Sequence, residues 1–309
     1  MHIVIVKDSL LPALLYGGTE RVIYSLGQSL HQLGHRVTLL CRKGSCASFA
    51  EVVAIDPSTP IIEQIPKDAD IVHFHDGVPD GYDQTPYIFT IHGNLASAEA
   101  RPPMAVFVSE NHAKRHGSTH YVLNGLNWDD YPAYEANAMR KNYHFLGNAA
   151  WRVKNVRGAI RIIRNVQGAE LDVLGGNRLN FKMGFRLTLN PRIHFHGMVD
   201  NQQKQQYINQ SRGLIFPILW DEPFGLCLTE SLFYGAPVFG SARGSLPEII
   251  TTDVGYLSND EEALTRYIAE GHSFNPDICH QYAADCFNAN VMARNYLKEY
   301  EAALNGERW

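Results

Sequence analysis

One segment, residues 213–241, constrains the fold most, because its pattern predicts a strand, a loop, a helix and a second strand in succession. Residues 213–218 and 238–241 are the apolar strands, and between them lies the run DEPFGLCLTE. In that run Glu222 and Glu230 are separated by seven residues. Loops that follow parallel strands, beside helix N-termini, are where α/β proteins hold phosphorylated ligands. The segment therefore predicts an α/β protein whose carboxylates can accept hydrogen bonds from sugar hydroxyls.

The same alternation continues along the chain. Apolar runs of four to six residues alternate with stretches of helical period, and the runs are apolar on both faces, as a helix-covered parallel sheet requires. The pattern is interrupted at residues 127–142, and 309 residues are more than one core usually holds. We therefore expect two doubly wound α/β domains facing each other, residues 1–138 and 139–309. The last helix is a candidate to cross back to the first domain.

Three local expectations can be compared directly with a structure. Residues 121–123 are predicted to form a strand, and residues 276–304 are predicted to be helical. The helix after the Pro-Phe-Gly turn is predicted to begin near Phe224, which would place Glu230 about two turns inside it.

Composition excludes several classes of protein. The net charge is −5 and no block of lysines or arginines is evident, so nucleic acid is a poor candidate partner. The five cysteines are odd in number and contain no Cys-x-x-Cys pair, which argues against a disulfide scaffold or a zinc ribbon. We expect no signal peptide and no membrane span, hence a cytoplasmic protein, with a peripheral contact at the inner membrane face left open.

The two glutamates have a functional and a structural interpretation. Glu230 could accept two hydrogen bonds from a ribose diol, and Glu222 could hold the hydroxyls of a transferred sugar. The amides of Phe224, Gly225 and Leu226 would face the ligand at the helix N-terminus. The structural alternative is that Glu222 and Asp221 only cap the helix.

Three further segments are candidate parts of the site. Gly17 and Gly18 precede a helix and would let the backbone approach an anion, although such loops are often only turns. Arg152 and Lys154 follow a strand and could neutralise a pyrophosphate, although they could equally be solvated. His92 ends a strand and could bond a sugar hydroxyl, or serve the fold alone.

A metal site is the remaining alternative. His73, His75 and Asp76 alternate at another strand end, but no third histidine lies in register. We therefore expect no metal.

In their order along the chain these motifs resemble the family 4 glycosyltransferases, which are retaining enzymes with the GT-B fold. The resemblance covers nearly the whole chain, and its most specific part is the Glu-x7-Glu run with its Pro-Phe-Gly-Leu core. The matching segments are residues 16–21, 73–76, 90–93, 108–110, 124–125, 145–147, 154–155, 222–230, 235–238 and 244–248.

The resemblance implies a role for each matching residue. In the second domain, Glu230 would bind the nucleotide ribose and Glu222 would contact the donor sugar near its 3-hydroxyl. The amides of Phe224, Gly225 and Leu226 would meet the sugar and the phosphates.

Other roles are implied outside that run. Gly17 and Gly18 would approach the diphosphate from the first domain, and His92 would lie beside the donor sugar. Lys154 would stabilise the leaving diphosphate, and the base would lie near Met198. Enzymes of this type usually need no bound metal or other cofactor.

Two departures from the family pattern stand out. Members commonly carry arginine where this chain has Asn148, and we expect Arg152 to supply that cation; otherwise catalysis would be weak or absent. The chain is also short between His75 and His92, so the acceptor side is pared down or completed by a partner.

The implied activity is transfer of a hexose-type sugar from a nucleoside diphosphate sugar, UDP favoured, to an acceptor hydroxyl of a glycan or glycolipid precursor. The anomeric configuration would be retained. A sugar-nucleotide epimerase or sugar phosphorylase of the same architecture is one alternative, and a non-catalytic nucleotide-sugar-binding protein is another. The sequence predicts no oligomeric state.

Overall fold

The computed structural model describes residues 1–13, 17–96, 101–182 and 184–309, which form two compact units. Unit 1 contains Met1–Trp128 and Phe287–Trp309, and unit 2 contains Asp129–Cys286. The boundary expected between residues 138 and 139 thus lies inside unit 2. The C-terminal segment belongs to unit 1.

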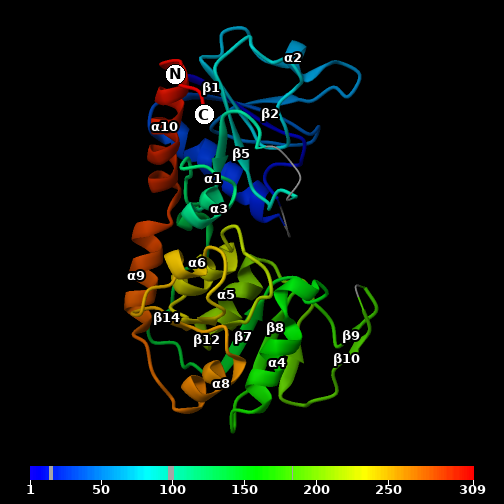
Figure 1. The fold of residues 1–309 in the computed structure, drawn as a ribbon, viewed down its shortest axis with the longest axis vertical. Coiled ribbons are helices and arrows are strands. Elements are labelled where there is room, and N and C mark those ends of the chain that lie inside the picture. Colours follow the sequence, from blue (N-terminus) through cyan, green and yellow to red (C-terminus); the bar gives the residue numbers. More distant parts are fainter. Residues whose placement is uncertain (14–16, 97–100, 183) are drawn as a thin grey trace. The chain divides into compact units, whose positions relative to one another are not determined.

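Unit 1 is a parallel six-stranded sheet covered by helices (Figure 1). Its strands are β1 (His2–Lys7), β2 (Arg36–Cys41), β3 (Glu51–Ala54), β4 (Ile71–Phe74), β5 (Tyr87–Ile91) and β6 (Ala105–Phe107). Its helices are α1 (Gly18–Gln32), α2 (Ile61–Gln64), α3 (Glu110–Arg115) and α10 (Ala289–Leu304). The strand order is β3-β2-β1-β4-β5-β6, so the winding direction reverses between β1 and β4.

Unit 2 repeats this topology. Its parallel strands are β7 (Asn142–Leu146), β8 (Leu171–Leu174), β11 (Ile193–Phe195), β12 (Ser211–Phe216), β13 (Val238–Gly240) and β14 (Gly255–Leu257). Its α-helices are α4 (Val156–Arg164), α5 (Asn201–Asn209), α6 (Leu226–Phe233), α7 (Leu246–Ile249), α8 (Glu261–Ala269) and α9 (Pro276–Cys286). The order β11-β8-β7-β12-β13-β14 reverses between β7 and β12. Both sheets have the Rossmann strand order, which confirms the expected fold class of two doubly wound α/β domains.

Shorter elements complete the chain. Two 3₁₀ turns, η1 (Trp128–Asp130) and η2 (Arg152–Lys154), lie in connecting segments. A separate antiparallel hairpin, β9 (Leu179–Asn180) and β10 (Arg186–Leu187), is inserted between β8 and β11. Among the described residues no helix is both long enough and apolar enough to span a membrane.

The strands lie in the core because apolar side chains occupy both of their faces. In β1, Ile3, Val4 and Ile5 are at most 1 % exposed. Helix α1 adds a stripe at helical spacing that includes Val22 and Leu26, which are buried against this sheet.

Helix α10 completes the core of unit 1. The Tyr300 hydroxyl lies 2.8 Å from Nδ1 of His73, and the Tyr296 hydroxyl lies 3.0 Å from Oγ1 of Thr90. Both tyrosines are at most 1 % exposed. The C-terminal helix is therefore an internal part of unit 1.

Two local expectations differ from the structure, and some short elements were not predicted. Residues 121–123 form only an isolated bridge from Tyr121 to Phe107, because β6 is short. The predicted helical stretch 276–304 is two helices, since Asn288 caps α10 through a bond from the Val291 amide. The strand β3 and the hairpin β9–β10 were not predicted, because each is short and largely exposed.

Candidate active site

The two reversal points direct attention to the carboxyl ends of the central strands. In open α/β sheets, ligands bind outside these ends, where the strand order reverses. In unit 2 this point lies between β7 and β12, and in unit 1 it lies between β1 and β4. Each point carries a Lys–carboxylate pair.

In unit 2, Lys154 and Glu222 form this pair. The loop after β7 carries Lys154 and the loop after β12 carries Glu222, and Nζ lies 2.6 Å from Oε2. The side chains are 13 % and 7 % exposed, so the pair is largely shielded from water. Trp220 donates its indole N–H to the same carboxylate oxygen at 2.8 Å, and its ring centroid lies 5.1 Å from the ammonium.

A glycine holds the loop of Glu222 in place. Gly244 follows β13 with φ +57°, and a Cβ there would lie 2.3 Å from the backbone nitrogen of Glu222. Next to it, Ser245 donates its backbone N–H to the Glu222 carbonyl at 3.0 Å and its hydroxyl to the Phe224 carbonyl at 2.7 Å. The loops after β12 and β13 thus position Glu222 together.

The helix after the turn begins later than predicted. Helix α6 starts at Leu226 with Gly225 as its N-cap, because Gly225 adopts the left-handed region at φ 85°. Phe224 is therefore outside the helix and its side chain is buried. Glu230 lies in the second turn and not two turns inside.

Glu230 is held in a buried ion pair. Lys204 of α5 places Nζ 2.5 Å from Oε1 of Glu230, and the two side chains are 7 % and 4 % exposed. The hydroxyl of Tyr131 donates to the same oxygen at 3.3 Å. Glu230 is therefore fixed in position by charge and by hydrogen bonding.

The charged groups converge on the first turn of α6. The charges of Lys154, Glu222 and Glu230 all act on the thiol of Cys227. Burial raises the pKa of Cys227, so its thiol is protonated and is a weak nucleophile.

Other predicted residues lie elsewhere in unit 2. Arg152 is in η2 with Lys154 but is exposed, and it lines a different hollow. Asn148 accepts a bond from the Ala150 amide at 3.0 Å, so it shapes the turn after β7. Met198 is 55 % exposed in the loop after β11.

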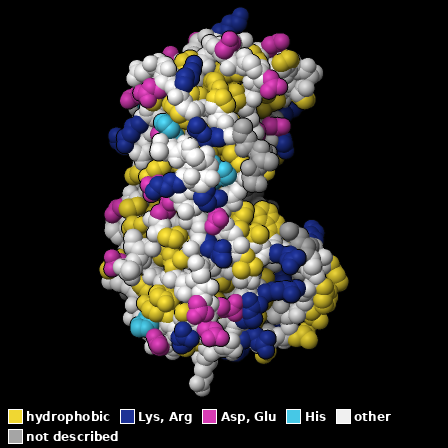
Figure 2. All heavy atoms as spheres, in the orientation of Figure 1, with side chains coloured by type: hydrophobic (Ala, Val, Ile, Leu, Met, Phe, Trp, Pro, Cys, Tyr) yellow, Lys and Arg dark blue, Asp and Glu magenta, His cyan; other side chains and the backbone are white. Residues whose placement is uncertain are grey.

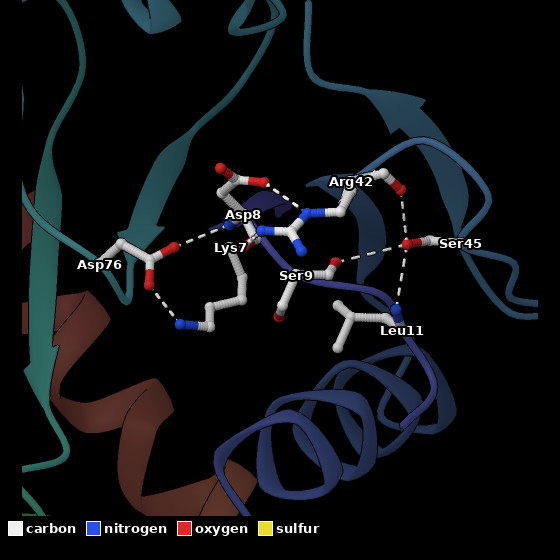
Figure 3. A network of polar contacts seen from close by, with 7 residues as sticks. All are labelled: Lys7, Asp8, Ser9, Leu11, Arg42, Ser45 and Asp76. Carbon is white, nitrogen blue, oxygen red and sulfur yellow. Dashed lines mark hydrogen bonds and ion pairs between the residues drawn. The ribbon is translucent and has the colours of Figure 1, made fainter. Parts of the chain in front are cut away.

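The reversal point of unit 1 is also charged (Figure 3). Lys7 at the end of β1 is paired with Asp76, which follows β4 and also accepts the Asp8 amide at 2.7 Å. Arg42, after β2, donates to the Asp8 carboxylate at 3.1 Å. Ser45 donates its hydroxyl to the Arg42 carbonyl at 2.7 Å. This network fixes the chain that leaves β1.

The predicted residues of unit 1 lie near the same sheet edge. Gly17 precedes α1, and a Cβ on it would lie 2.8 Å from the Ala13 Cβ; Gly18 begins the helix. His92 follows β5, and its Nε2 lies 2.9 Å from Nδ1 of His75. Burial lowers the pKa of His92 to about 3, so its ring is neutral near pH 7. Tyr16 of the same motif lies outside the described residues.

The histidines did not assemble into a metal site with a carboxylate. No cluster of three or more His, Cys, Asp or Glu suited to a metal occurs in the parts of the chain that are described. His73 is bonded instead to Tyr300 and Thr90 in the core.

Sequence reasoning missed the partners of the key carboxylates. Lys204 lies in a polar helix and Lys7 at the end of an apolar strand, and nothing in their local sequence marks either. Trp220 lies two residues before Glu222, and that proximity was the one usable signal.

Comparison with protein families identifies two regions. Residues 16–141 match the family described as Glycosyltransferase Family 4, and residues 140–271 match the family described as Glycosyl transferases group 1. Over 117 residues the chain is 30 % identical to a Klebsiella pneumoniae protein described as "Uncharacterized 41.2 kDa protein in cps region". That match covers 36 % of this chain and 32 % of the relative, so the chain spans about a third of the relative's length.

Solved structures share the fold across the whole chain. AviGT4, a glycosyltransferase involved in avilamycin A biosynthesis, has a TM-score of 0.78 at 19 % identity over 100 % of this chain and 99 % of that one. Sucrose-phosphate synthase from Thermosynechococcus elongatus has a TM-score of 0.73 at 15 % identity, over 99 % of this chain and 100 % of that one. HepE of Anabaena, in complex with UDP and glucose, has a TM-score of 0.67 at 12 % identity, over 98 % of this chain and 100 % of that one.

Both matched families are glycosyltransferases. Each family matches less than half of the chain, and the two Rossmann-like domains have the GT-B fold of the solved structures.

Proposed function

We propose that this protein transfers a hexose-type sugar from a nucleoside diphosphate sugar to an acceptor hydroxyl, with retention of configuration. The observation that carries the proposal is the Lys154–Glu222 pair at the strand-order reversal of unit 2, with Glu230 in the second turn of α6, the helix that follows Glu222. UDP is the favoured nucleotide, because HepE, which shares the fold, was solved with UDP and glucose. A glycan or glycolipid precursor is the proposed acceptor.

Each charged residue is assigned to a different part of the donor. Glu230, fixed by Lys204, accepts hydrogen bonds from the ribose hydroxyls. Glu222 accepts from a hydroxyl of the donor sugar, and the N-terminal amides of α6 face the phosphates. On donor binding, Lys154 exchanges part of its bond to Glu222 for the diphosphate, where negative charge develops.

The chemical step needs no covalent intermediate on the protein. The bond from the anomeric carbon to the diphosphate oxygen breaks, and its electron pair leaves with the nucleotide. The acceptor oxygen forms the new bond on the same face, and its proton passes to a phosphate oxygen. Cys227, next to the pair, is held as a neutral thiol by its raised pKa and does not act as the nucleophile.

Lysine charge takes the place of a divalent metal in this proposal. Lys154 neutralises the leaving diphosphate, and Arg152 of the same 3₁₀ turn is the proposed second cation. His92 of unit 1 remains a predicted contact of the donor sugar.

Nucleotide binding tests the site directly. Isothermal titration of UDP, GDP and ADP without divalent metal should show one preferred nucleotide. Glu230→Gln should weaken it about tenfold or more, because a ribose bond to a charged acceptor is worth roughly 1.5–3 kcal/mol. Glu262→Gln, on a side chain 88 % exposed in α8, is the control and should bind like the wild type. If a folded sample binds none of the three nucleotides, the proposal is wrong.

A protein that binds a nucleotide sugar without transferring it is the second candidate. Asn148 favours it, because this side chain serves the turn after β7 where related enzymes commonly carry arginine. Release of nucleotide from the bound donor on addition of acceptor would exclude this alternative.

A further inference from the structure

Residues of helix α4 and of the hairpin β9–β10 line an arginine-rich hollow, which shares only Arg152 with the proposed reaction. It has a volume of 480 Å³, and its lining includes Arg152, Arg157, Arg161 and Arg186. A neighbouring hollow of 650 Å³ shares the last three and adds Arg164. We call the two together the arginine hollow.

Apart from Arg152, the hollow is distinct from the candidate active site. Lys154, Glu222 and Glu230 are not among the residues that line its described surface. It lies on the outer face of α4, and it is bounded on the other side by residues of the hairpin such as Asn180 and Gly184.

Positive charge is concentrated in this part of the chain. Residues 152–192 contain nine Lys and Arg but only two Asp and Glu, in a chain whose net charge is −5. Figure 2 shows the basic side chains gathered within a hollow on this lobe. Arg161 is paired with Glu261 at 2.7 Å, whereas no ion pair of Arg157, Arg164 or Arg186 occurs among the described residues. The hollow therefore presents a net positive field.

Arg186 shows that the hollow suits an anion. The residue is 7 % exposed, and its guanidinium donates to the carbonyl of Asn177 at 2.9 Å and to the Thr188 hydroxyl at 3.3 Å. Burial and the charge of Arg157 lower the pKa of Arg186. A buried guanidinium with neutral partners gains most from a phosphate, which matches its planar donors.

Exposed apolar side chains adjoin the hollow, and three of them, Phe185, Leu187 and Leu189, line it. Five large hydrophobic side chains of the hairpin region face water, and the most exposed are Leu189 at 79 % and Phe181 at 72 %. The rings of Phe181 and Phe185 lie 5.7 Å apart, so they form one apolar surface. We call this set the apolar rim: Leu179, Phe181, Phe185, Leu187 and Leu189. A patch of this kind beside basic groups marks an interaction surface.

We propose that the arginine hollow and the apolar rim dock unit 2 onto a bilayer that contains anionic phospholipids. The arginines bind lipid phosphates, and the rim enters the boundary between headgroups and acyl chains. A bilayer fits better than a soluble phosphate compound, because a soluble anion would use the arginines and leave Phe181 and Leu189 in water. The inference goes beyond the proposed sugar transfer and does not depend on it.

Vesicle co-sedimentation of the full chain tests the proposal. Equimolar phosphatidylglycerol and phosphatidylcholine vesicles should bind the protein, and pure phosphatidylcholine vesicles should bind it much more weakly. Arg157→Gln should weaken binding about fivefold, the value expected for one basic residue at an anionic surface. Phe181→Ser with Leu189→Ser should weaken it at least as much.

Two matched control variants test whether the loss of binding is specific to this surface. Arg294→Gln removes an exposed arginine of α10, and Met139→Ser removes a side chain that is 73 % exposed outside the hairpin. Both should bind vesicles as the wild type does, and circular dichroism should show all variants folded.

Three results would overturn the proposal. One is equal binding to neutral and anionic vesicles, or no binding to either kind. Another is binding that the rim variant does not change, with displacement from the vesicles by inorganic phosphate, which would assign the hollow to a soluble anion. The third is a dimer of the free protein that the rim substitutions dissociate, which would assign the surface to a second copy of the chain. Nucleotide titration is a separate readout, so these failures leave the proposed transfer untouched.

Discussion

Replacing Lys204 with methionine should destabilise unit 2 strongly while leaving the shape of the side chain nearly unchanged. Its ammonium lies 2.5 Å from Oε1 of Glu230, and the side chains are 7 % and 4 % exposed. Unit charges at this distance attract by about 7 kcal/mol at an effective dielectric constant near 20. Desolvation offsets much of that attraction, but the variant leaves Glu230 buried without its cation. Losing one partner of such a pair costs about 3–5 kcal/mol.

Thermal unfolding followed by circular dichroism measures this loss. For a unit of this size, each kcal/mol lowers the Tm by about 2–4 °C, so Lys204→Met should lower it by roughly 6–20 °C. Adding Glu230→Gln should restore most of the loss, because the buried charge is then gone and Tyr131 keeps an acceptor.

An exposed pair provides the comparison. Lys114 and Glu110 of α3 are also close, at 2.7 Å, but their side chains are 65 % and 46 % exposed. Lys114→Met should therefore cost at most about 1 kcal/mol. If the two lysine variants lower the Tm equally, or if the double variant recovers nothing, burial of the Lys204–Glu230 charge is not what stabilises the site.

Two further predictions concern the fold around the site. Gly244→Ala should lower the Tm more than Gly271→Ala, because both glycines have positive φ but only at Gly244 would the added Cβ meet the backbone, 2.3 Å from the Glu222 nitrogen; equal losses in thermal scans would contradict the close-packing argument. Burial lowers the pKa of His92, His112 and His144 to about 3, below the unfolded value near 6.5. Each group's contribution to stability is therefore complete above about pH 6.5. That contribution is lost as the pH falls toward 3, by up to about 1.4 kcal/mol per pH unit. Urea unfolding at pH 7.5, 6 and 5 should show this decline, His144→Gln should make it shallower, and an unchanged midpoint would refute it.

The sequence was sufficient for the class of fold because periodicity records burial. Strands such as β1 and β12 are apolar on both faces, and only a helix-covered parallel sheet accommodates that pattern. Element ends were less predictable. The start of α6 depends on Gly225 adopting a left-handed conformation beside Glu222, which is a property of packing and not of local preference.

The site was predictable only in part, for a similar reason. Glu222, Glu230 and Lys154 stand in recognisable motifs, whereas Lys204 reaches Glu230 from a different helix. The arginine hollow was missed because its basic residues are dispersed over residues 152–192, where no run of adjacent charges occurs. Folding brings Arg157 of α4 beside Arg186 of the hairpin, and the charge becomes dense only then.

Unit 1 is assembled from both ends of the chain, and this has a consequence for synthesis. During translation, unit 2 is a continuous stretch and can fold as soon as it leaves the ribosome. The sheet of unit 1 emerges earlier, yet the hydroxyls that bond His73 and Thr90 belong to Tyr300 and Tyr296, which are made after unit 2. We therefore expect unit 2 to complete its fold before unit 1, although the sheet of unit 1 is made first. The nascent chain should depend most on chaperones between the synthesis of that sheet and the synthesis of α10.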